Sequence, residues 1–234
     1  MKNITKLFLY LNFCLTLLAC SKISPKGEIE VKDVTVENFT KLNLKGDFKV
    51  FFAKGNQNLV SVETYPNVYK NLDIEVENGI LTIEENRKTE QVDFYNITIF
   101  GKNDLNEVSL SDKVEMNVSG QVKTPEFSLH LKGNSKFMGA VIAPKSKIEM
   151  AEKSNANILG ETKNLNLKLT DSASIMAPYF YVENLEILSK NGASAGLNID
   201  QEMKGTLENT SKLIFYGEPL NKLIKKDKAS VENR

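Results

Sequence analysis

The amino-acid sequence predicts an all-β protein folded as an irregular right-handed parallel β-helix, that is, a β-solenoid of short stacked coils. Three observations predict this fold class. From Val34 onwards apolar and polar residues alternate over short runs, turn residues such as Gly and Asn separate those runs, and the second half repeats a similar pattern about every twenty residues. Alternation with period two is typical of strands with one buried face, and a repeat made of short strands and turns is typical of a solenoid.

The first nineteen residues, 1–19, are predicted to be a lipoprotein signal peptide. A basic start at Lys2 and Lys6 precedes a mostly apolar run, which is too short to cross a ~30 Å hydrocarbon core. Ala19 before Cys20 resembles the bacterial lipobox. This resemblance implies cleavage before Cys20, lipidation of its thiol and anchoring in a membrane. The alternative is an ordinary secretory signal followed by a chance cysteine.

Cleavage would remove Cys14 and leave Cys20 as the single cysteine of the mature chain, and lipidation explains an unpaired thiol in an exported protein. The expected location is therefore the bacterial cell envelope, with a lipid anchor in the outer membrane and the body on its periplasmic or surface side. Residues 20–33, which are polar and contain Pro25 and Gly27, are predicted to form a flexible tether.

The N-terminal part of the predicted domain, residues 34–100, consists of short alternating runs. Six of these runs are expected to be strands, at 34–36, 42–44, 48–52, 59–62, 72–76 and 80–83. Asn78-Gly79 between the last two runs is typical of a tight hairpin turn, because both residues must reach positive φ. The segment 67–71 fits either a helical turn or a loop.

The repeat part, residues 104–217, carries the solenoid signal. Each copy is an alternating strand, a polar turn and a second strand with Ser or Ala, and a degenerate copy at 108–116 begins the series. The matched apolar positions of successive copies step by 21, 17, 20 and 18 residues and are Phe137, Ile158, Ile175, Ala195 and Leu213. Coils stacked at ~4.8 Å would form one continuous core. The alternative architecture is an antiparallel β-sandwich, which also has strands every 8–12 residues or so, roughly the spacing seen here.

The order of these pieces resembles the head GIN domain, a family of unknown function that is also described as an auto-transporter adhesin head. The resemblance covers about residues 35–219. It rests on the opening Phe39-Thr-Lys-Leu-Asn-Leu-Lys-Gly46, on the turns Ser172-Ala-Ser174 and Asn191-Gly-Ala-Ser194, and on the closing Phe215-Tyr-Gly-Glu-Pro219. The resemblance implies a β-helix-like domain over 34–219, and it brings no established catalytic or binding residue.

Several functional classes lack support in the sequence. The 234 residues carry 30 basic and 30 acidic side chains, so nothing indicates the basic face of a nucleic-acid-binding protein. The single histidine, His130, lies between two apolar residues and is expected to be a solvent-facing strand residue rather than a catalytic base or a metal ligand. No catalytic residue, cofactor-binding residue or metal ligand is therefore predicted. The charged segment 220–234 is expected to be a frayed tail, with a cap on the last coil as the alternative.

The candidate binding surface consists of aromatic side chains and of polar residues that recur at the turns. Tyr179 and Tyr181 flank Phe180, and neighbours in a strand point to opposite faces, so these aromatics cannot all be buried. The turn residues that recur beside Ser or Gly, and that complete this candidate surface, are Asn134, Asn155 and Asn191. Such residues are expected to form ladders that satisfy backbone groups from coil to coil.

These features predict a lipid-anchored envelope protein that acts as a non-enzymatic adhesion, binding or structural module. The expected partners are the membrane, through the lipid on Cys20, and a carbohydrate or an envelope protein. No nucleic acid is expected, and an oligomer stays open. The alternatives are a polysaccharide-binding protein and a carbohydrate-active β-helix enzyme. The scarcity of arginine, with Arg87 as the single internal one, argues against an enzyme that cleaves anionic sugars.

Overall fold

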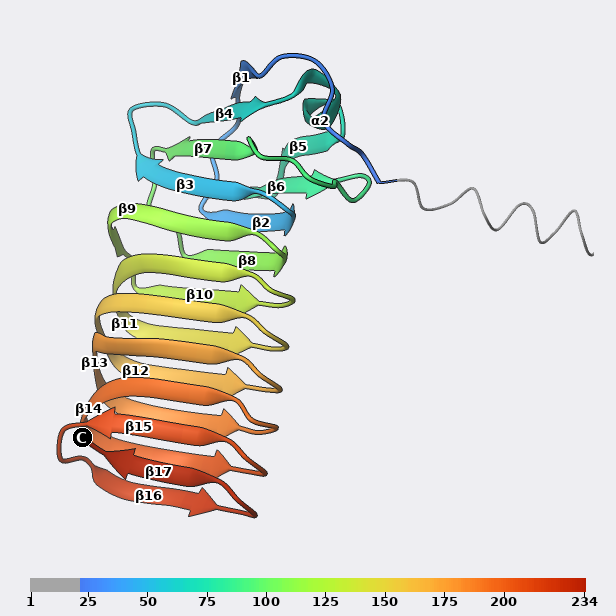
Figure 1. The fold of residues 1–234 in the computed structure, drawn as a ribbon. Coiled ribbons are helices and arrows are strands. Elements are labelled where there is room, and N and C mark those ends of the chain that lie inside the picture. The colour runs from blue at the N-terminus through green and yellow to red at the C-terminus, as the bar shows by residue number, and fades with distance from the viewer. Residues whose placement is uncertain (1–21) are drawn as a thin grey trace, which may run out of the picture.

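A computed structural model describes residues 22–234, so Cys20 and the predicted signal peptide lie outside the described residues. The described chain forms an elongated stack of strands, a β-solenoid of about seven turns with a differently built part at its N-terminal end (Figure 1). The predicted all-β solenoid is confirmed, and the parallel stacking excludes the antiparallel sandwich. Within residues 22–234, no helix has the length and apolar character needed to cross a membrane.

The strands are stacked in two sheets that face each other. The N-terminal part contains β1 (Glu30–Thr35), β2 (Lys41–Gly46), β3 (Lys49–Lys54), β4 (Leu59–Thr64), α2 (Pro66–Tyr69), β5 (Leu72–Glu77), β6 (Ile80–Glu85) and β7 (Asn96–Gly101). The repeat part contains β8 (Glu107–Asp112), β9 (Glu115–Lys123), β10 (Glu126–Leu131), β11 (Lys136–Met150), β12 (Asn155–Leu169), β13 (Ser174–Ser189), β14 (Ser194–Leu207), β15 (Lys212–Tyr216), β16 (Leu220–Lys225) and β17 (Ser230–Asn233). From β6 to β10 successive strands alternate between the two sheets, whereas β3 and β4 share one sheet and β5 and β6 share the other.

The long strands of the repeat part each contribute to both sheets. In β12, residues 155–162 pair in parallel with the first half of β11, and residues 164–169 pair in parallel with its second half. β8 and β9 make the same pairings with β10 and β11, so the degenerate first copy is confirmed as a coil. Side chains that face inward from both sheets form one continuous hydrophobic core along the stack.

The register corrects one expectation about the repeat. Phe137 pairs with Ala156, and Ala156 pairs with Ile175. Ile158, which the sequence pattern matched to Phe137, lies one inward position further along β12. Both Ala156 and Ile158 are buried, because strand residues two apart share a face. Matching the larger apolar residue of β12 to Phe137 therefore gives the wrong register, because both inward positions are apolar.

The four-residue turns of the repeat part share one backbone conformation. Their second residues have positive φ and are Asp112, Gly133, Glu152, Asp171, Asn191, Asn209 and Asp227. Asn209 Nδ2 donates to Asn191 Oδ1, and Asn191 Nδ2 donates to Asp171 Oδ1 at 3.4 Å. The structure thus contains a polar ladder at these turns. Asn134 and Asn155, in contrast, occupy other positions and do not belong to it.

The N-terminal part differs in chain order and strand direction. β2 and β3 stack in parallel on β8 and β9, and β6 and β7 stack in parallel on β2 and β3. β4 then pairs antiparallel with β7, β1 with β4, and β5 with β6. The hairpin between β5 and β6 has φ of 51° at Asn78 and 76° at Gly79, as its sequence predicts. α2 supplies the helical turn that was one of two expectations for this region.

Part of the predicted tether is bound to the fold, which differs from the expectation for residues 20–33. Ile23 is buried; its N–H donates to Lys88 O and its C=O accepts from Glu90 N, both at 2.9 Å. β1 begins at Glu30 and pairs along its whole length with β4. The segment is mostly polar, but the side chain of Ile23 packs in the core.

Residues 220–234 are also part of the fold, so the expectation of a frayed tail is wrong. β16 pairs in parallel with β14, and β17 pairs in parallel with β15, so this segment forms the last coil (Figure 1). Leu223, Ala229 and Val231 pack against the core at the spacing of inward-facing residues. The charges that suggested a tail lie on the outer face of that coil.

Candidate functional site

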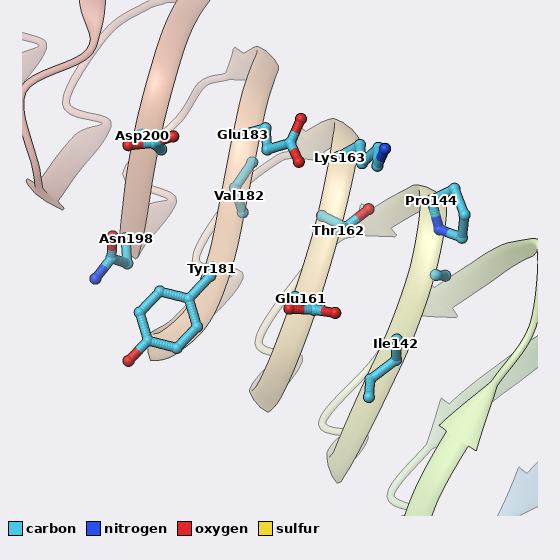
Figure 2. A pocket seen from close by; sticks show the side chains of 11 residues that line it. Ile142, Pro144, Glu161, Thr162, Lys163, Tyr181, Val182, Glu183, Asn198 and Asp200 are labelled. Atoms are coloured by element: carbon cyan, nitrogen blue, oxygen red, sulfur yellow. The ribbon is translucent and has the colours of Figure 1, made fainter.

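A groove crosses the edge of the solenoid where the long strands bend. It has a volume of about 390 Å³ and spans four consecutive strands, β11, β12, β13 and β14. Its lining residues are Ile142, Ala143, Pro144, Glu161, Thr162, Lys163, Tyr181, Val182, Glu183, Asn198 and Asp200, most of which are labelled in Figure 2. β11, β12 and β13 each contribute three consecutive residues and β14 contributes Asn198 and Asp200, so the groove exists only where coils are stacked.

The parallel register arranges these side chains in columns along the solenoid axis. Ile142 pairs with Glu161, Glu161 with Tyr181, and Tyr181 with Asn198. Figure 2 shows these four side chains following one another across the four strands. Neighbours in such a column lie one strand spacing apart, about 4.8 Å. The column therefore presents a regular series of contacts to a ligand that lies along the axis.

A second outward column lies at the bend itself. The residues between the two columns, Ala143, Thr162 and Val182, are buried and fix the strands to the core. Beyond them Pro144, Lys163, Glu183 and Asp200 turn outward again, as expected for alternating strand residues (Figure 2). The groove thus consists of two outward-facing columns of side chains with a buried row between them.

The charge of the groove is negative. Three carboxylates, those of Glu161, Glu183 and Asp200, face one ammonium group, that of Lys163, which gives a formal charge of −2 (one positive minus three negative). Within residues 22–234, none of these four side chains takes part in an ion pair. Their charges are therefore directed to solvent or to a ligand.

The exposed tyrosines result from an insertion in β13. Ala177 and Tyr181 pair with the consecutive residues Leu197 and Asn198 of β14, so Pro178, Tyr179 and Phe180 have no partner in that strand. Phe180 is fully buried, whereas Tyr179 and Tyr181 are 66% and 56% exposed. The expectation that these aromatics cannot all be buried is confirmed. Tyr181 lines the groove, and Tyr179 lies two residues before it.

The predicted asparagines do not join the tyrosines in one surface. Asn191 belongs to the ladder at the four-residue turns, and Asn134 borders a separate hollow that Lys113 also lines. Asn155 begins β12, where its Nδ2 donates to Lys153 O at 2.8 Å. The repeat pattern did not identify the polar groove residues, because an insertion in β13 shifts the spacing that would align Glu161 with its neighbours in the column.

His130 lies on the outer face of β10, as expected. Its Nδ1 is 3.3 Å from Glu149 Oε2, and both side chains are partly exposed. The pKa of Glu149 is lowered, mainly by a hydrogen bond from Lys147 and further by the charges of Lys147 and His130. Among residues 22–234, no group of three or more His, Cys, Asp or Glu side chains is arranged to hold a metal ion. His130 thus forms a surface pair between neighbouring coils.

Burial perturbs two ionisable groups in the N-terminal part, away from the groove. Tyr95 is 4% exposed, and burial raises its pKa, with a further contribution from Glu85. Burial also raises the pKa of Glu85. Glu85 Oε1 accepts from Thr89 Oγ1 at 2.9 Å, and Glu85 Oε2 accepts from the backbone N–H of Asp47 at 3.2 Å. These bonds hold the loop after β6 against the turn between β2 and β3.

Comparison with known proteins relates the chain to one family. Residues 38–219 match the family described as "Putative auto-transporter adhesin, head GIN domain". A crystal structure of a "putative adhesin" from Bacteroides fragilis has a TM-score of 0.83 at 15% sequence identity and covers 91% of this chain and 100% of its own. Structures with the same description from Parabacteroides distasonis and Parabacteroides merdae have TM-scores of 0.73 and 0.71 at 14% and 16% identity, each covering 92% of this chain and 100% of its own.

At these identities the solved structures show a shared fold. No curated protein matches the chain. The family model spans most of the described residues, from the segment before β2 to the turn before β16. The chain therefore belongs to the head GIN domain family.

Proposed function

We propose that the protein is a lipid-anchored, non-enzymatic adhesin of the bacterial cell envelope and that it binds a glycan strand in the groove across β11 to β14. One observation carries the proposal. The parallel register places Ile142, Glu161, Tyr181 and Asn198 in one outward column, with one side chain per coil. A linear polymer that lies along the axis would meet one side chain of this column at every coil.

The chemistry of the groove supports a saccharide. Tyr181 offers an exposed ring face for stacking on a sugar ring, and its hydroxyl is available for hydrogen bonding. The carboxylate of Glu161 can accept hydrogen bonds from hydroxyl groups on one side of that ring, and the amide of Asn198 can donate or accept them on the other. A protein partner that buries a large apolar area fits less well, because four of the lining residues, Glu161, Lys163, Glu183 and Asp200, are charged.

The negative charge narrows the class of glycan. Carboxylates of Glu161, Glu183 and Asp200 repel uronic acids and other anionic sugars, and they attract protonated amino groups. We therefore expect neutral glycans or glycans with free amino sugars. The exposure of Glu161 and Asp200 also supports binding rather than cleavage, since glycosidases hold two carboxyl groups in fixed positions across the scissile bond.

The anchoring part of the proposal rests on the sequence around Cys20. Ala19-Cys20 follows a short apolar run, and several acyl chains on one residue would anchor the protein stably in the outer membrane. The test is fractionation of cells that produce the wild type or Cys20→Ala. We expect lipid labelling and membrane retention of the wild type and release of the variant. Retention of the variant, together with an unlabelled wild type, would contradict the anchor.

The ligand is tested with the soluble chain that begins at Ser21, applied to an array of neutral, amino-sugar and uronic-acid oligosaccharides. Tyr181→Ala is expected to weaken binding about tenfold, as for loss of one aromatic stacking contact. Phe51→Ala is the matched control, because Phe51 is also an exposed aromatic, 46% accessible, and its strand β3 does not line the groove. Equal losses for the two variants, binding to uronic acids alone, or capture of a protein without any glycan would contradict glycan binding in this groove. Release of reducing sugar would show an enzyme.

A further inference from the structure

We infer that the N-terminal end of the solenoid lies directly on the membrane that holds the anchor, with Lys22, Lys26, Arg87 and Lys88 in contact with lipid headgroup phosphates. These four residues are called the basic patch below. The inference rests on the lipidation of Cys20 proposed above, and it adds an orientation of the body and a surface that contacts the bilayer.

The distance between anchor and fold carries the argument. The fold holds the chain from Lys22 onwards, because Ile23 is buried and forms two backbone hydrogen bonds of 2.9 Å with Lys88 and Glu90. Two peptide units separate the Cα atoms of Cys20 and Lys22, so these atoms are at most about 7 Å apart. A lipid on Cys20 therefore leaves no length of tether that could lift this end of the solenoid from the headgroups.

Two asparagines fix the segments that carry the basic patch. Asn71 is 4% exposed; its Oδ1 accepts from Arg87 N at 3.0 Å and its Nδ2 donates to Arg87 O at 2.6 Å. Asn67 Oδ1 accepts from Lys26 N at 2.8 Å, and Asn67 Nδ2 donates to Ser24 O at 2.9 Å. The backbone of both segments is thus held on the fold while the side chains of the patch are exposed.

The two segments nearest the anchor carry a charge that suits anionic headgroups. The strands β1 and β5 of the same end are acidic, with Glu30, Asp33, Asp73, Glu75 and Glu77 against Lys32. Segments 22–28 and 86–90 carry the four cations of the patch and the two carboxylates of Glu28 and Glu90, a balance of +2 (four minus two). The chain from Cys20 onwards has 28 basic and 30 acidic residues, a balance of −2. Lys22 pairs with Glu90 at 2.8 Å, but within residues 22–234 no carboxylate pairs with Arg87, Lys88 or Lys26.

Arg87 is suited to this role by its side chain. Its guanidinium group is planar and can donate two parallel hydrogen bonds to one phosphate. Arg87 is the chain neighbour of Lys88. The carbonyl of Lys88 accepts the hydrogen bond from Ile23 N, so both cations lie beside the point where the chain leaves the fold. Both groups would lie within a screening length of the headgroups, about 8–10 Å at physiological salt.

The basic patch and the groove lie at different levels of the stack. Along one sheet the strand order runs from β7 through β3 and β9 to β11, β12, β13 and β14. At ~4.8 Å per strand, the groove extends from about 15 to 30 Å beyond β7. The membrane-contacting end and the ligand-binding edge are thus different regions of the solenoid.

The test uses the lipidated chain in vesicles of phosphatidylethanolamine and phosphatidylglycerol that contain a headgroup-attached nitroxide quencher. Because acylation occupies Cys20, an engineered cysteine is the single free thiol and can carry a fluorophore. Lys88→Cys reports on the basic patch, and Lys228→Cys, an exposed lysine of the last coil, is the matched control. We expect quenching at position 88 to exceed that at position 228 several-fold.

Charge reversal in the basic patch provides a second test, measured as quenching in the same vesicles. Arg87→Glu combined with Lys26→Glu is expected to weaken the headgroup contact by about tenfold or more, and so to reduce quenching at position 88. The control Lys225→Glu with Lys228→Glu, two lysines of the last coil, should leave it unchanged. Equal quenching at positions 88 and 228 in a chain retained through Cys20 overturns this inference alone. A wild type that does not stay with the vesicles overturns the anchor and this inference together.

Discussion

The N-terminal part and the repeat part use the same two sheets but fill the space between them differently. At the inward position that ends the four-residue turn, the N-terminal part has Phe48, whereas the repeat part has Ala173, Ala193 and Ser211. Phe48 packs against Tyr95 with ring centroids 5.4 Å apart. Small side chains allow the turns to stack closely coil after coil, whereas large aromatic side chains fill the space where the chain order changes. The size of the side chain at this inward position thus differs between the two parts.

The two ends of the stack differ in the direction of the strands that cover them. At the N-terminal end antiparallel strands β1, β4 and β5 cover the last parallel coil, and the chain also adds α2 there (Figure 1). At the C-terminal end β16 and β17 continue the parallel stack. Lysines on this last coil, such as Lys225 and Lys228, make its strand edges less suitable for pairing with another chain.

The largest expected effect comes from a glycine on which the close stacking of the repeat part depends. Gly205 has φ of +121°, and a Cβ there would lie 1.9 Å from Ile187 O in the neighbouring coil. Because a backbone carbonyl cannot move aside, Gly205→Ala should lower the free energy of unfolding by more than about 5 kcal/mol, or prevent folding. Denaturant unfolding followed by circular dichroism measures this loss.

The matched control for Gly205 lies in the N-terminal part. Gly79 also has positive φ, +76°, but a Cβ there would meet nothing within 4 Å. Gly79→Ala should therefore cost about 1–2 kcal/mol, the cost of a left-handed conformation alone. Similar losses for the two variants would show that coil stacking does not depend on this close approach.

A smaller effect is expected in the polar ladder at the turns. Asn209 has φ of +57° and its Nδ2 donates to Asn191 Oδ1. Asn209→Ala should cost about 1–2 kcal/mol, because alanine tolerates this φ less well and the hydrogen bond is lost. Asn157→Ala, on the exposed face of β12, should change the free energy of unfolding by less than about 0.5 kcal/mol. If thermal unfolding shows no difference between the two variants, the ladder does not stabilise the repeat part.

The smallest effect is a pH dependence that belongs to the N-terminal part. Burial raises the pKa of Glu85 above its ordinary value, so the folded chain binds this proton more tightly than the unfolded chain does. Stability from this group is therefore present at low pH and is lost as pH rises through the raised pKa of the folded state. Glu85→Gln should remove that loss, so its unfolding free energy should depend less on pH above the ordinary carboxyl range. Glu75→Gln, at an exposed position of β5, is the control, and an unchanged slope in Glu85→Gln would contradict the assignment.

Sequence reasoning succeeded where a local pattern determines the structure. Period-two alternation identified the strands, Asn78-Gly79 identified the hairpin, and the approximate repeat identified stacked coils. It failed where the structure depends on contacts between distant segments. The burial of Ile23 depends on a partner at Lys88, and the choice of Ala156 over Ile158 depends on the register between β11 and β12.

The groove could be predicted only in part for the same reason. Tyr181 was identified, because alternation next to the buried Phe180 is a local property. Its neighbours in the groove lie a whole coil away in sequence, and an insertion in β13 shifts the spacing that would align them. A column of side chains formed by stacking becomes visible once the register is known.

The most direct test of the account is hydrogen exchange of the soluble chain with and without the oligosaccharide that it binds most strongly on the array. Ligand in the groove should slow exchange in four separate segments one coil apart, around Ile142, Glu161, Tyr181 and Asn198, and should leave the four-residue turns unchanged. Slower exchange confined to one continuous segment, or located at the turns, would contradict a binding surface built by the stacking of coils.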